Sequence, residues 1–569
     1  MEENMKQNMA PFTPGGEERA TLPVVEGTTL KVEEGASLKI VEGAKKEAGK
    51  ETRETQRMKE NFHFFGPVTA AYALFYAFCM YKNSAGITFP FFLASSLLYF
   101  GFSMKKLGLT FKKGSIFYMI SVMLLAVSTF CTADEKLIFL NQLGIILLMF
   151  SFLLSQFFHT EQWGLGKYLG SILETFFASF SEMNRPIGDG VQYVKSHQGE
   201  EKRKIYYVLL GLVITIPLLL IVAALLGSAD AVFRQVTDTI WRTINLSNVF
   251  GVVLRIVLWY FGAYMLLANL CNHTLKEEVK DHRSGEPLVA ITITAMLSLL
   301  YLFFSWIQIV YLFLGKLQLP EGYTYATYAR EGFFQLLAVS VLNLIIVLVC
   351  MAFFRESRVL KGILTVMSLC TFVMIASSGL RMILYIQTYN LTFLRIFVLW
   401  SLCVLTLLFI GVLISIYRRC FPLFRYSVTV VTCLYVALSF AHPDLIIAKF
   451  NLENADARLD YSYLSELSED AAPVLVPYLR EQGYVLSVIK AEDKAPRDDE
   501  TEQYGRNEMT GGYWPSVEKV SGGERESRGN AQGFGYYYLE RIWKARRSMT
   551  IRSFNLSRWL AVRATRQGF

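Results

Sequence analysis

The stretch FFQLLAVSVLNLIIVLVCMAFF, residues 333–354, carries no charged side chain along its whole length. A helix needs about 20 mostly apolar residues to cross the roughly 30 Å hydrocarbon layer of a bilayer, where it satisfies its own backbone hydrogen bonds. The stretch therefore predicts a transmembrane helix. Shortly before it, Arg330 and Glu331 place two charged side chains at the start of that helix, and the role of these charges has to be explained.

Comparable apolar runs recur between residues 66 and 441 of the 569-residue chain. Apolar residues make up 53% of it and charged residues only 18%, a balance that excludes an ordinary soluble protein. The eleven runs that we count lie at residues 66–82, 86–103, 115–132, 136–157, 205–227, 247–270, 288–314, 333–354, 360–379, 391–416 and 421–441. Together they predict an all-α fold, a polytopic transmembrane helix bundle of about 11 spans with a small C-terminal helical soluble domain.

Motifs for catalysis, metal binding and cofactors are missing from the sequence. It has no CxxC or HExxH, no P-loop, no dinucleotide-binding glycine pattern and no kinase signature. None of the six histidines falls in a recognisable serine, cysteine or metal constellation, and seven of the eight cysteines lie in or against apolar runs. We therefore expect no enzymatic activity, no catalytic residues, no metal and no cofactor.

Lysine and arginine gather in every second loop between the predicted spans. The basic loops lie around residues 105–113, 167–204, 276–283, 355–361 and 418–425, whereas the alternate loops hold few basic residues. Short basic loops stay on the cytoplasmic side of a membrane. We therefore expect a cytoplasmic N-terminus and an extracytoplasmic C-terminal region. One span more or fewer would reverse the predicted membrane orientation of the second half of the chain.

The predicted domains follow from these spans. Residues 1–62 form a polar tail with an eight-residue pattern that repeats Gly27, Gly35 and Gly43, and we expect this tail to be cytoplasmic and largely disordered. Spans one to four occupy residues 63–158, and spans five to eleven occupy residues 205–441. The cytoplasmic loop between them, residues 159–204, is expected to carry a helix in the headgroup plane. Its apolar face would contain Leu169, Ile172, Leu173, Phe176, Phe177 and Phe180.

The C-terminal region, residues 442–569, has the pattern of a small helical domain. Leu459, Tyr463, Leu464 and Leu467 form one apolar face. Ser468 then provides an N-cap for a second helix, with Glu469 and Asp470 in its first turn, where the helix dipole favours acidic residues. A charged, glycine-rich linker is expected near residues 493–533. The last segment is basic and aromatic, with Asn555 as the cap of a helix whose Leu556, Trp559, Leu560 and Arg563 share one face. This helix could dock on the first two helices or lie on the bilayer, and we expect docking. Binding to nucleic acid is excluded by the extracytoplasmic location.

Polar residues gather near the predicted outer ends of several spans. The candidate ligand-binding residues are Asp230, Arg234, Arg330, Glu331, Arg381, Tyr385 and Arg395. Ionisable groups at the edge of the hydrocarbon cost free energy unless they are paired or hydrated, and arginine binds carboxylates and phosphates in a bidentate manner. These residues predict an anion-binding site. The alternative is that they only snorkel to headgroups and fix the depth of the helices.

Six segments in order along the chain resemble an uncharacterised family of bacterial multi-pass membrane proteins, domain of unknown function 4173, which is akin to family 4153. They are SADAVFRQ, IQIVYLFLG, YATYAREGFFQLLAV, SGLRMILYIQTYNLTFLR, LDYSYLSELSEDAAPVL and SFNLSRWLAVRA, between Ser228 and Ala564. The resemblance implies a protein of the bacterial plasma membrane with about ten to twelve helices and a soluble C-terminal part. It implies no activity.

The function that we expect is non-catalytic binding or scaffolding on the envelope side of a plasma membrane. The expected partners are the lipid bilayer and an anionic envelope ligand or a membrane protein. One alternative is a transporter or lipid flippase for an anionic substrate. A second alternative is a membrane sensor or regulatory partner whose N-terminal tail contacts cytoplasmic proteins.

Overall fold

The structure is a computed structural model. It describes residues 52–160, 163–197, 246–272, 283–310, 325–418, 421–454, 459–490, 513–519 and 530–566, with a few positions between 211 and 230. In parts of these ranges, residues 325–331 among them, it describes the backbone alone. Met1–Glu51, which contain the predicted octads, form a separate unit outside the described residues, and everything below concerns the unit Thr52–Phe569.

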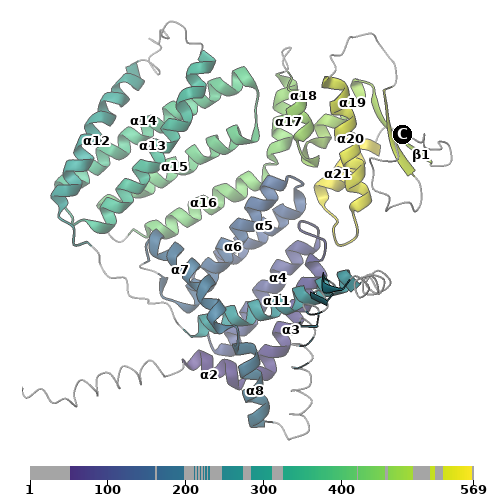
Figure 1. Cartoon of the computed structure of the whole chain (residues 1–569). Coiled ribbons are helices and arrows are strands. Elements are labelled where there is room, and N and C mark those ends of the chain that lie inside the picture. The colour runs from purple at the N-terminus through teal and green to yellow at the C-terminus, as the bar shows by residue number, and fades with distance from the viewer. Residues whose placement is uncertain are drawn as a thin grey trace, which may run out of the picture. The chain divides into compact units, whose positions relative to one another are not determined.

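The first group of helices packs around one apolar core that includes Phe65, Phe152 and Tyr264. Helix α3 packs on α4 and α11, α4 packs on α5, and α5 packs on α6 (Figure 1). The elements are α2 (Arg53–Glu60), α3 (Phe62–Met80), α4 (Thr88–Leu107), α5 (Ser115–Cys131), α6 (Glu135–Phe157), α7 (Leu165–Ser179), η2 (Phe180–Glu182), α8 (Arg185–His197) and α11 (Leu246–Cys271).

The second group of helices packs around α14. Helices α12 and α13 both contact α14, which also contacts α15, and α15 contacts α16. Helix α16 then packs on α5 and so connects the two groups (Figure 1). The elements are α12 (Pro287–Gln308), α13 (Tyr325–Phe353), α14 (Arg358–Tyr389), α15 (Phe393–Tyr417) and α16 (Leu423–Phe440).

Eight of the described helices are long and apolar enough to cross a membrane: α3, α6, α11, α12, α13, α14, α15 and α16. Large apolar side chains such as Leu288, Phe303 and Trp306 are about two-thirds exposed on them, as expected of surfaces that face lipid. The predicted fold class, a polytopic α-helical bundle, is therefore confirmed. With α4 and α5, these helices coincide with every predicted span except the fifth, at residues 205–227, most of which lies outside the described residues.

The ninth predicted span is too short. Helix α14 does not stop near residue 379 but continues to Tyr389, so Arg381 and Tyr385 belong to this helix and not to a loop. An arginine suggests the end of an apolar helix because its charge is costly in hydrocarbon. The helix continues because the side chain of Arg381 is buried and donates a hydrogen bond to the amide oxygen of Gln308 on the neighbouring helix α12.

Helix α2 and the loop after α6 also differ from the expectation. Residues of the predicted tail form α2, which is capped by Thr52 and packs through Met58 and Thr55. In the loop, α7 is helical as expected, and five of the six apolar side chains of its predicted face are exposed. They are Leu169, Leu173, Phe176, Phe177 and Phe180. Ile172 instead packs in the core beneath, because α7 also contacts α11 and α6.

The C-terminal region forms a second apolar core with the ends of α13 to α15. Its elements are α17 (Pro443–Glu453), α18 (Tyr461–Glu466), η4 (Glu469–Ala471), α19 (Ala472–Glu481), β1 (Tyr484–Lys490), β2 (Tyr513–Lys519), α20 (Asn530–Ser548) and α21 (Leu556–Arg566). Strands β1 and β2 pair in an antiparallel manner, with Tyr484 opposite Lys519. The sequence analysis expected helices alone here, and β2 falls inside the predicted linker.

Helix α21 packs on α19 and η4, which is the docking that the sequence favours. Asn555 caps it, since its Oδ1 accepts from the backbone N–H of Arg558 at 3.1 Å. The predicted packing face was wrong, however. Ser557, Ala561 and Val562 are the buried residues, whereas Trp559 and Leu560 are more than a third exposed.

Candidate functional site

The C-terminal region is fastened to three short loops of the helix bundle. At the α3–α4 loop, the backbone N–H of Ile87 donates to the carbonyl of Phe554 at 2.7 Å. At the α14–α15 loop, the side-chain amide of Asn451 exchanges two hydrogen bonds with the backbone of Leu391, at 2.7 and 2.9 Å. The third loop, between α5 and α6, is held by Asp470.

Asp470 is 4% exposed and lies at the centre of what we call the Asp470 junction, formed by Thr132, Ala133, His442, Asp470 and Ser557. Its carboxylate accepts from the hydroxyls of Thr132 and Ser557 at 2.5 Å each, from the N–H of Ala133 at 2.6 Å, and bonds His442 Nδ1 at 3.0 Å. One carboxylate thus joins the α5–α6 loop, the start of α17, η4 and α21.

The charge of Asp470 is stabilised by these bonds. Burial by itself would raise its pKa, but the bonds from His442, Ser557, Thr132 and Ala133 outweigh it and hold the pKa below the ordinary value. The same bond raises the pKa of His442, against a smaller opposing effect of burial. The ion pair of His442 and Asp470 is therefore favoured on mild acidification.

Two further buried carboxylates lie close to this junction. Burial, followed by the charge of Asp444, raises the pKa of Asp134 to about 6, and a backbone bond from Lys136 opposes the shift. Burial likewise raises the pKa of Asp444, whose carboxylate accepts from the N–H of Ser468 at 2.8 Å. Within the described ranges, no group of three or more His, Cys, Asp or Glu residues is arranged to hold a metal ion.

We expect the substitution Asp134→Asn to stabilise the protein near neutral pH. Asp134 Oδ1 caps α6 through the N–H of Lys136, a role that asparagine can take, while Oδ2 is buried without a hydrogen-bond partner among the described residues. The folded-state pKa is raised, so ionisation above pH ~4 costs stability until pH ~6. The gain is expected to be on the order of 2 kcal/mol above pH 6 and to vanish below pH 4.

Thermal unfolding of the detergent-solubilised protein across this pH range measures the effect. Glu453→Gln is the matched control, because Glu453 is exposed and its one ion pair among the described residues is with Lys449 on the surface of α17. Its unfolding temperature should follow that of the wild type at every pH. An Asp134→Asn variant that is equally stable or less stable at pH 7.5 would contradict the prediction.

Some of the seven ligand-binding residues predicted from the sequence lie together in the structure. Arg381 is 7% exposed and donates from Nη2 to Oε1 of Gln308 on α12 at 3.4 Å, and the hydroxyl of Ser377 donates to the same oxygen at 2.6 Å. The guanidinium lies against Gly332 of α13, where a Cβ atom would overlap Nη1. A side chain at position 332 would therefore displace the guanidinium.

Arg395 lies over the ring of Tyr385, with its guanidinium carbon 4.2 Å from the ring centroid. It also donates to the backbone carbonyls of Tyr389 and Asn390 at the end of α14. Tyr385 follows Arg381 by one helical turn and stacks on Phe333 at 6.0 Å. We call Gln308, Arg381, Tyr385 and Arg395 the outer polar cluster. Cation–π stacking and buried amide contacts of this kind fix the guanidinium groups in place.

The structure describes no side-chain contact between this cluster and the other four predicted residues, Asp230, Arg234, Arg330 and Glu331. Arg330 and Glu331 lie in the first turns of α13, but only their backbone is described. Asp230 is exposed at the end of a described fragment, and Arg234 lies outside the described residues. Three of the seven predicted residues, Arg381, Tyr385 and Arg395, are therefore in one place.

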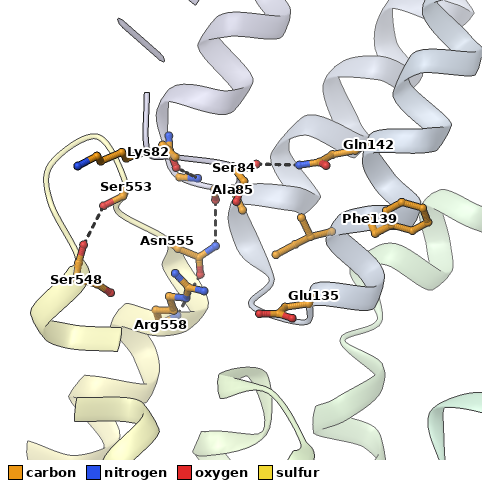
Figure 2. A pocket seen from close by; sticks show the side chains of 13 residues that line it. Lys82, Ser84, Ala85, Glu135, Phe139, Gln142, Ser548, Ser553, Asn555 and Arg558 are labelled. Carbon is orange, nitrogen blue, oxygen red and sulfur yellow. Dashed lines mark hydrogen bonds between the residues drawn. The ribbon is translucent and has the colours of Figure 1, made fainter. Parts of the chain in front are cut away.

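A pocket of about 380 Å³ lies where the C-terminal region meets the α3–α4 loop and the start of α6. Figure 2 shows Asn555 and Arg558 on one side of it and Glu135 and Phe139 on the other. Its lining combines six amide or hydroxyl side chains and three charged side chains with apolar ones. The lining residues are Lys82, Asn83, Ser84, Ala85, Gly86, Glu135, Ile138, Phe139, Gln142, Ser548, Ser553, Asn555 and Arg558.

The sequence analysis did not predict the Asp470 junction or this pocket. It placed Asp470 in the first turn of a helix after the Ser468 cap, and Ser468 Oγ does accept from the N–H of Asp470 at 3.4 Å. The sequence gives no signal for the partners of Asp470, because one of them, Thr132, lies 338 positions earlier in the chain. Such pairs come together only through tertiary packing.

Comparison with protein families identifies the chain. A sequence profile described as Domain of unknown function (DUF4153) matches residues 119–478, from α5 to α19. The chain belongs to this family. The expectation of an uncharacterised family is confirmed through family 4153, which the sequence analysis named as akin to 4173. The match covers both the outer polar cluster and Asp470.

No curated protein and no solved structure matches the chain. The family and the apolar helices together establish a multi-pass membrane protein. The role of its sites is therefore argued from their chemistry.

Proposed function

We propose that the protein is a non-catalytic binding or scaffold protein of a bacterial plasma membrane, with its C-terminal region on the envelope side. One observation carries the proposal. The C-terminal region is joined to the α3–α4, α5–α6 and α14–α15 loops, and these are loops that carry few lysines and arginines. By the positive-inside rule such loops are extracytoplasmic.

Contacts at the other ends of the helices support the same orientation. Arg57 of α2 donates to the carbonyl of Leu107 at 2.5 Å, and Thr55 donates to Asn272 at 2.7 Å. Leu107 and Asn272 adjoin the lysine-rich segments that follow α4 and α11. The start of α2 and the C-terminal region are thus associated with loops of opposite charge character, as an odd number of spans requires.

The ligand chemistry follows from the outer polar cluster. The contacts that position Arg381 and Arg395 include the amide of Gln308, the ring of Tyr385 and the backbone carbonyls of Tyr389 and Asn390. A carboxylate or phosphate group of an envelope component is the ligand that two such arginines favour.

Cysteine labelling tests the orientation on which this function depends. Ser462 is exposed on α18, and Ser196 is exposed on α8, within the basic segment of residues 167–204. Each is replaced by cysteine in a variant cleared of native cysteines, and intact cells are treated with a membrane-impermeant maleimide. We expect labelling at position 462 and protection at position 196 until the cells are lysed. The reverse pattern would refute an envelope-facing role.

A further inference from the structure

The pocket beside α21 is lined by the charged side chains of Arg558, Lys82 and Glu135. Neither Arg558 nor Glu135 forms an ion pair with any residue in the described part of the chain. Arg558 Nε is buried and has no hydrogen-bond partner among the described residues. Lys82 lies over the ring of Tyr81 at 5.6 Å and forms no ion pair among the described residues. Guanidinium and ammonium groups without a counter-charge at the wall of a pocket favour an incoming anionic acceptor.

The position of the pocket is at headgroup depth. It lies at the end of α3 and the start of α6, both of which are long and apolar enough to cross a membrane. The interfacial layer of a bilayer begins where the apolar part of such helices ends. A ligand in this pocket would therefore be level with phospholipid headgroups, whichever side of the membrane the C-terminal region occupies.

An apolar strip runs from the pocket down α6. Phe139 lines the pocket, and its ring points away from α21 (Figure 2). Phe139, Leu143 and Ile146 follow one another at helical spacing on one face, and their exposed fractions are 65%, 44% and 53%. Because this face is apolar and exposed within a membrane-spanning helix, acyl chains are the natural material to cover it.

We propose that this pocket binds the headgroup of a zwitterionic phospholipid of the phosphatidylethanolamine type, with its acyl chains along the Phe139, Leu143 and Ile146 face. Arg558 and Lys82 bind the phosphodiester, and Glu135 binds the ammonium group. The hydroxyl and amide groups of Ser84, Ser548 and Ser553 and their neighbours provide further hydrogen bonds. The bound lipid would join the C-terminal region to the bundle at the bilayer surface.

The volume agrees with this ligand. About 380 Å³ accommodates a headgroup with its glycerol but leaves no room for acyl chains, which must lie outside on α6. The side chain of Arg558 takes no part in the described hydrogen bonds around the pocket. Its backbone N–H alone donates to Asn555, which caps α21. The side chain can therefore be changed without removing a described structural contact.

Native mass spectrometry of the full-length, delipidated protein in detergent tests the proposal by titration with phosphatidylethanolamine. Arg558→Gln should weaken lipid binding about tenfold, as expected for loss of one charge-assisted hydrogen-bond pair. Arg563→Gln is the matched control, because Arg563 is exposed on the same helix and outside the pocket. It should bind lipid as the wild type does. Equal binding by the Arg558→Gln variant, with the wild-type unfolding temperature, would overturn the proposal.

Two further arms identify the ligand. Glycerophosphoethanolamine has the same headgroup without acyl chains and should compete only weakly. Competition as strong as that of the lipid would mean a site for a free phosphodiester and would refute the lipid assignment.

Glu135→Gln should weaken the binding of phosphatidylethanolamine but not that of phosphatidylglycerol, which has no ammonium group. Equal loss of both lipids, or of neither, would refute the role of Glu135.

Discussion

Replacing Asp470 by asparagine is expected to destabilise the docked C-terminal region by about 3 kcal/mol, the range observed when one member of a buried, hydrogen-bonded charge pair is removed. Asp470 accepts from three donors of the protein besides pairing with His442. Asparagine has only one acceptor oxygen, and its amide nitrogen would face groups that donate. At least one buried donor would then remain unsatisfied.

The effect should depend on pH in a defined way. The pKa of Asp470 is lowered in the folded protein, so its stabilising contribution is complete above the unfolded value near 4 and is lost as the pH falls below it. The pKa of His442 is raised, so its contribution is complete below about 6.5 and is lost as the pH rises through the folded value. The difference between wild type and variant is thus expected to be largest near pH 5 to 6.

Hydrogen exchange of the solubilised protein measures this destabilisation locally. Amides of η4, α19 and α21 should exchange faster in the Asp470→Asn variant, while those of α12 and α13 should not change. Glu453→Gln, on the exposed surface of α17, is the control, since surface ion pairs contribute less than about 1 kcal/mol. Unchanged protection of α21 in the Asp470→Asn variant would show that the other two loops suffice for docking.

Replacing Arg381 by glutamine is the second change with a large expected effect. It removes a buried guanidinium that contacts Gln308 of α12 and lies against Gly332 of α13. We expect a loss of about 2 kcal/mol in stability, since hydrogen bonds to charged groups contribute more than neutral ones. If the outer polar cluster binds an anionic ligand, complementation of a deletion strain by this variant should also fail.

A pair of additional variants separates the charge of Arg381 from its position. Arg358→Gln is the control, because Arg358 is exposed at the other end of the same helix. Gly332→Ala keeps the charge of Arg381 but displaces the guanidinium from its present place against α13. We expect it to reproduce part of the loss. Wild-type stability and full complementation by both Arg381→Gln and Gly332→Ala would exclude a role for the cluster.

Membrane class, helix positions and family could be recognised from the sequence because each depends on residues close together in the chain. A run such as residues 333–354 needs no distant partner to specify a membrane helix, since lipid supplies its surroundings. The grouping of Arg381, Tyr385 and Arg395 was also accessible, because they lie within 15 positions on adjoining segments. Helix capping by Ser468 and Asn555 is equally local.

Tertiary structure alone decided where the C-terminal region docks and what its buried charges do. Helix α2 and the extension of α14 were missed because charged residues there are stabilised by partners elsewhere in the chain, such as Gln308 for Arg381. Asp470 reads in the sequence as a helix-capping acid and becomes a junction only when Thr132 and Ser557 are brought to it. Local sequence determines whether a segment enters the membrane. The position of the sites is determined by pairing between polar groups that are distant in the chain, because their burial is favourable only when they pair.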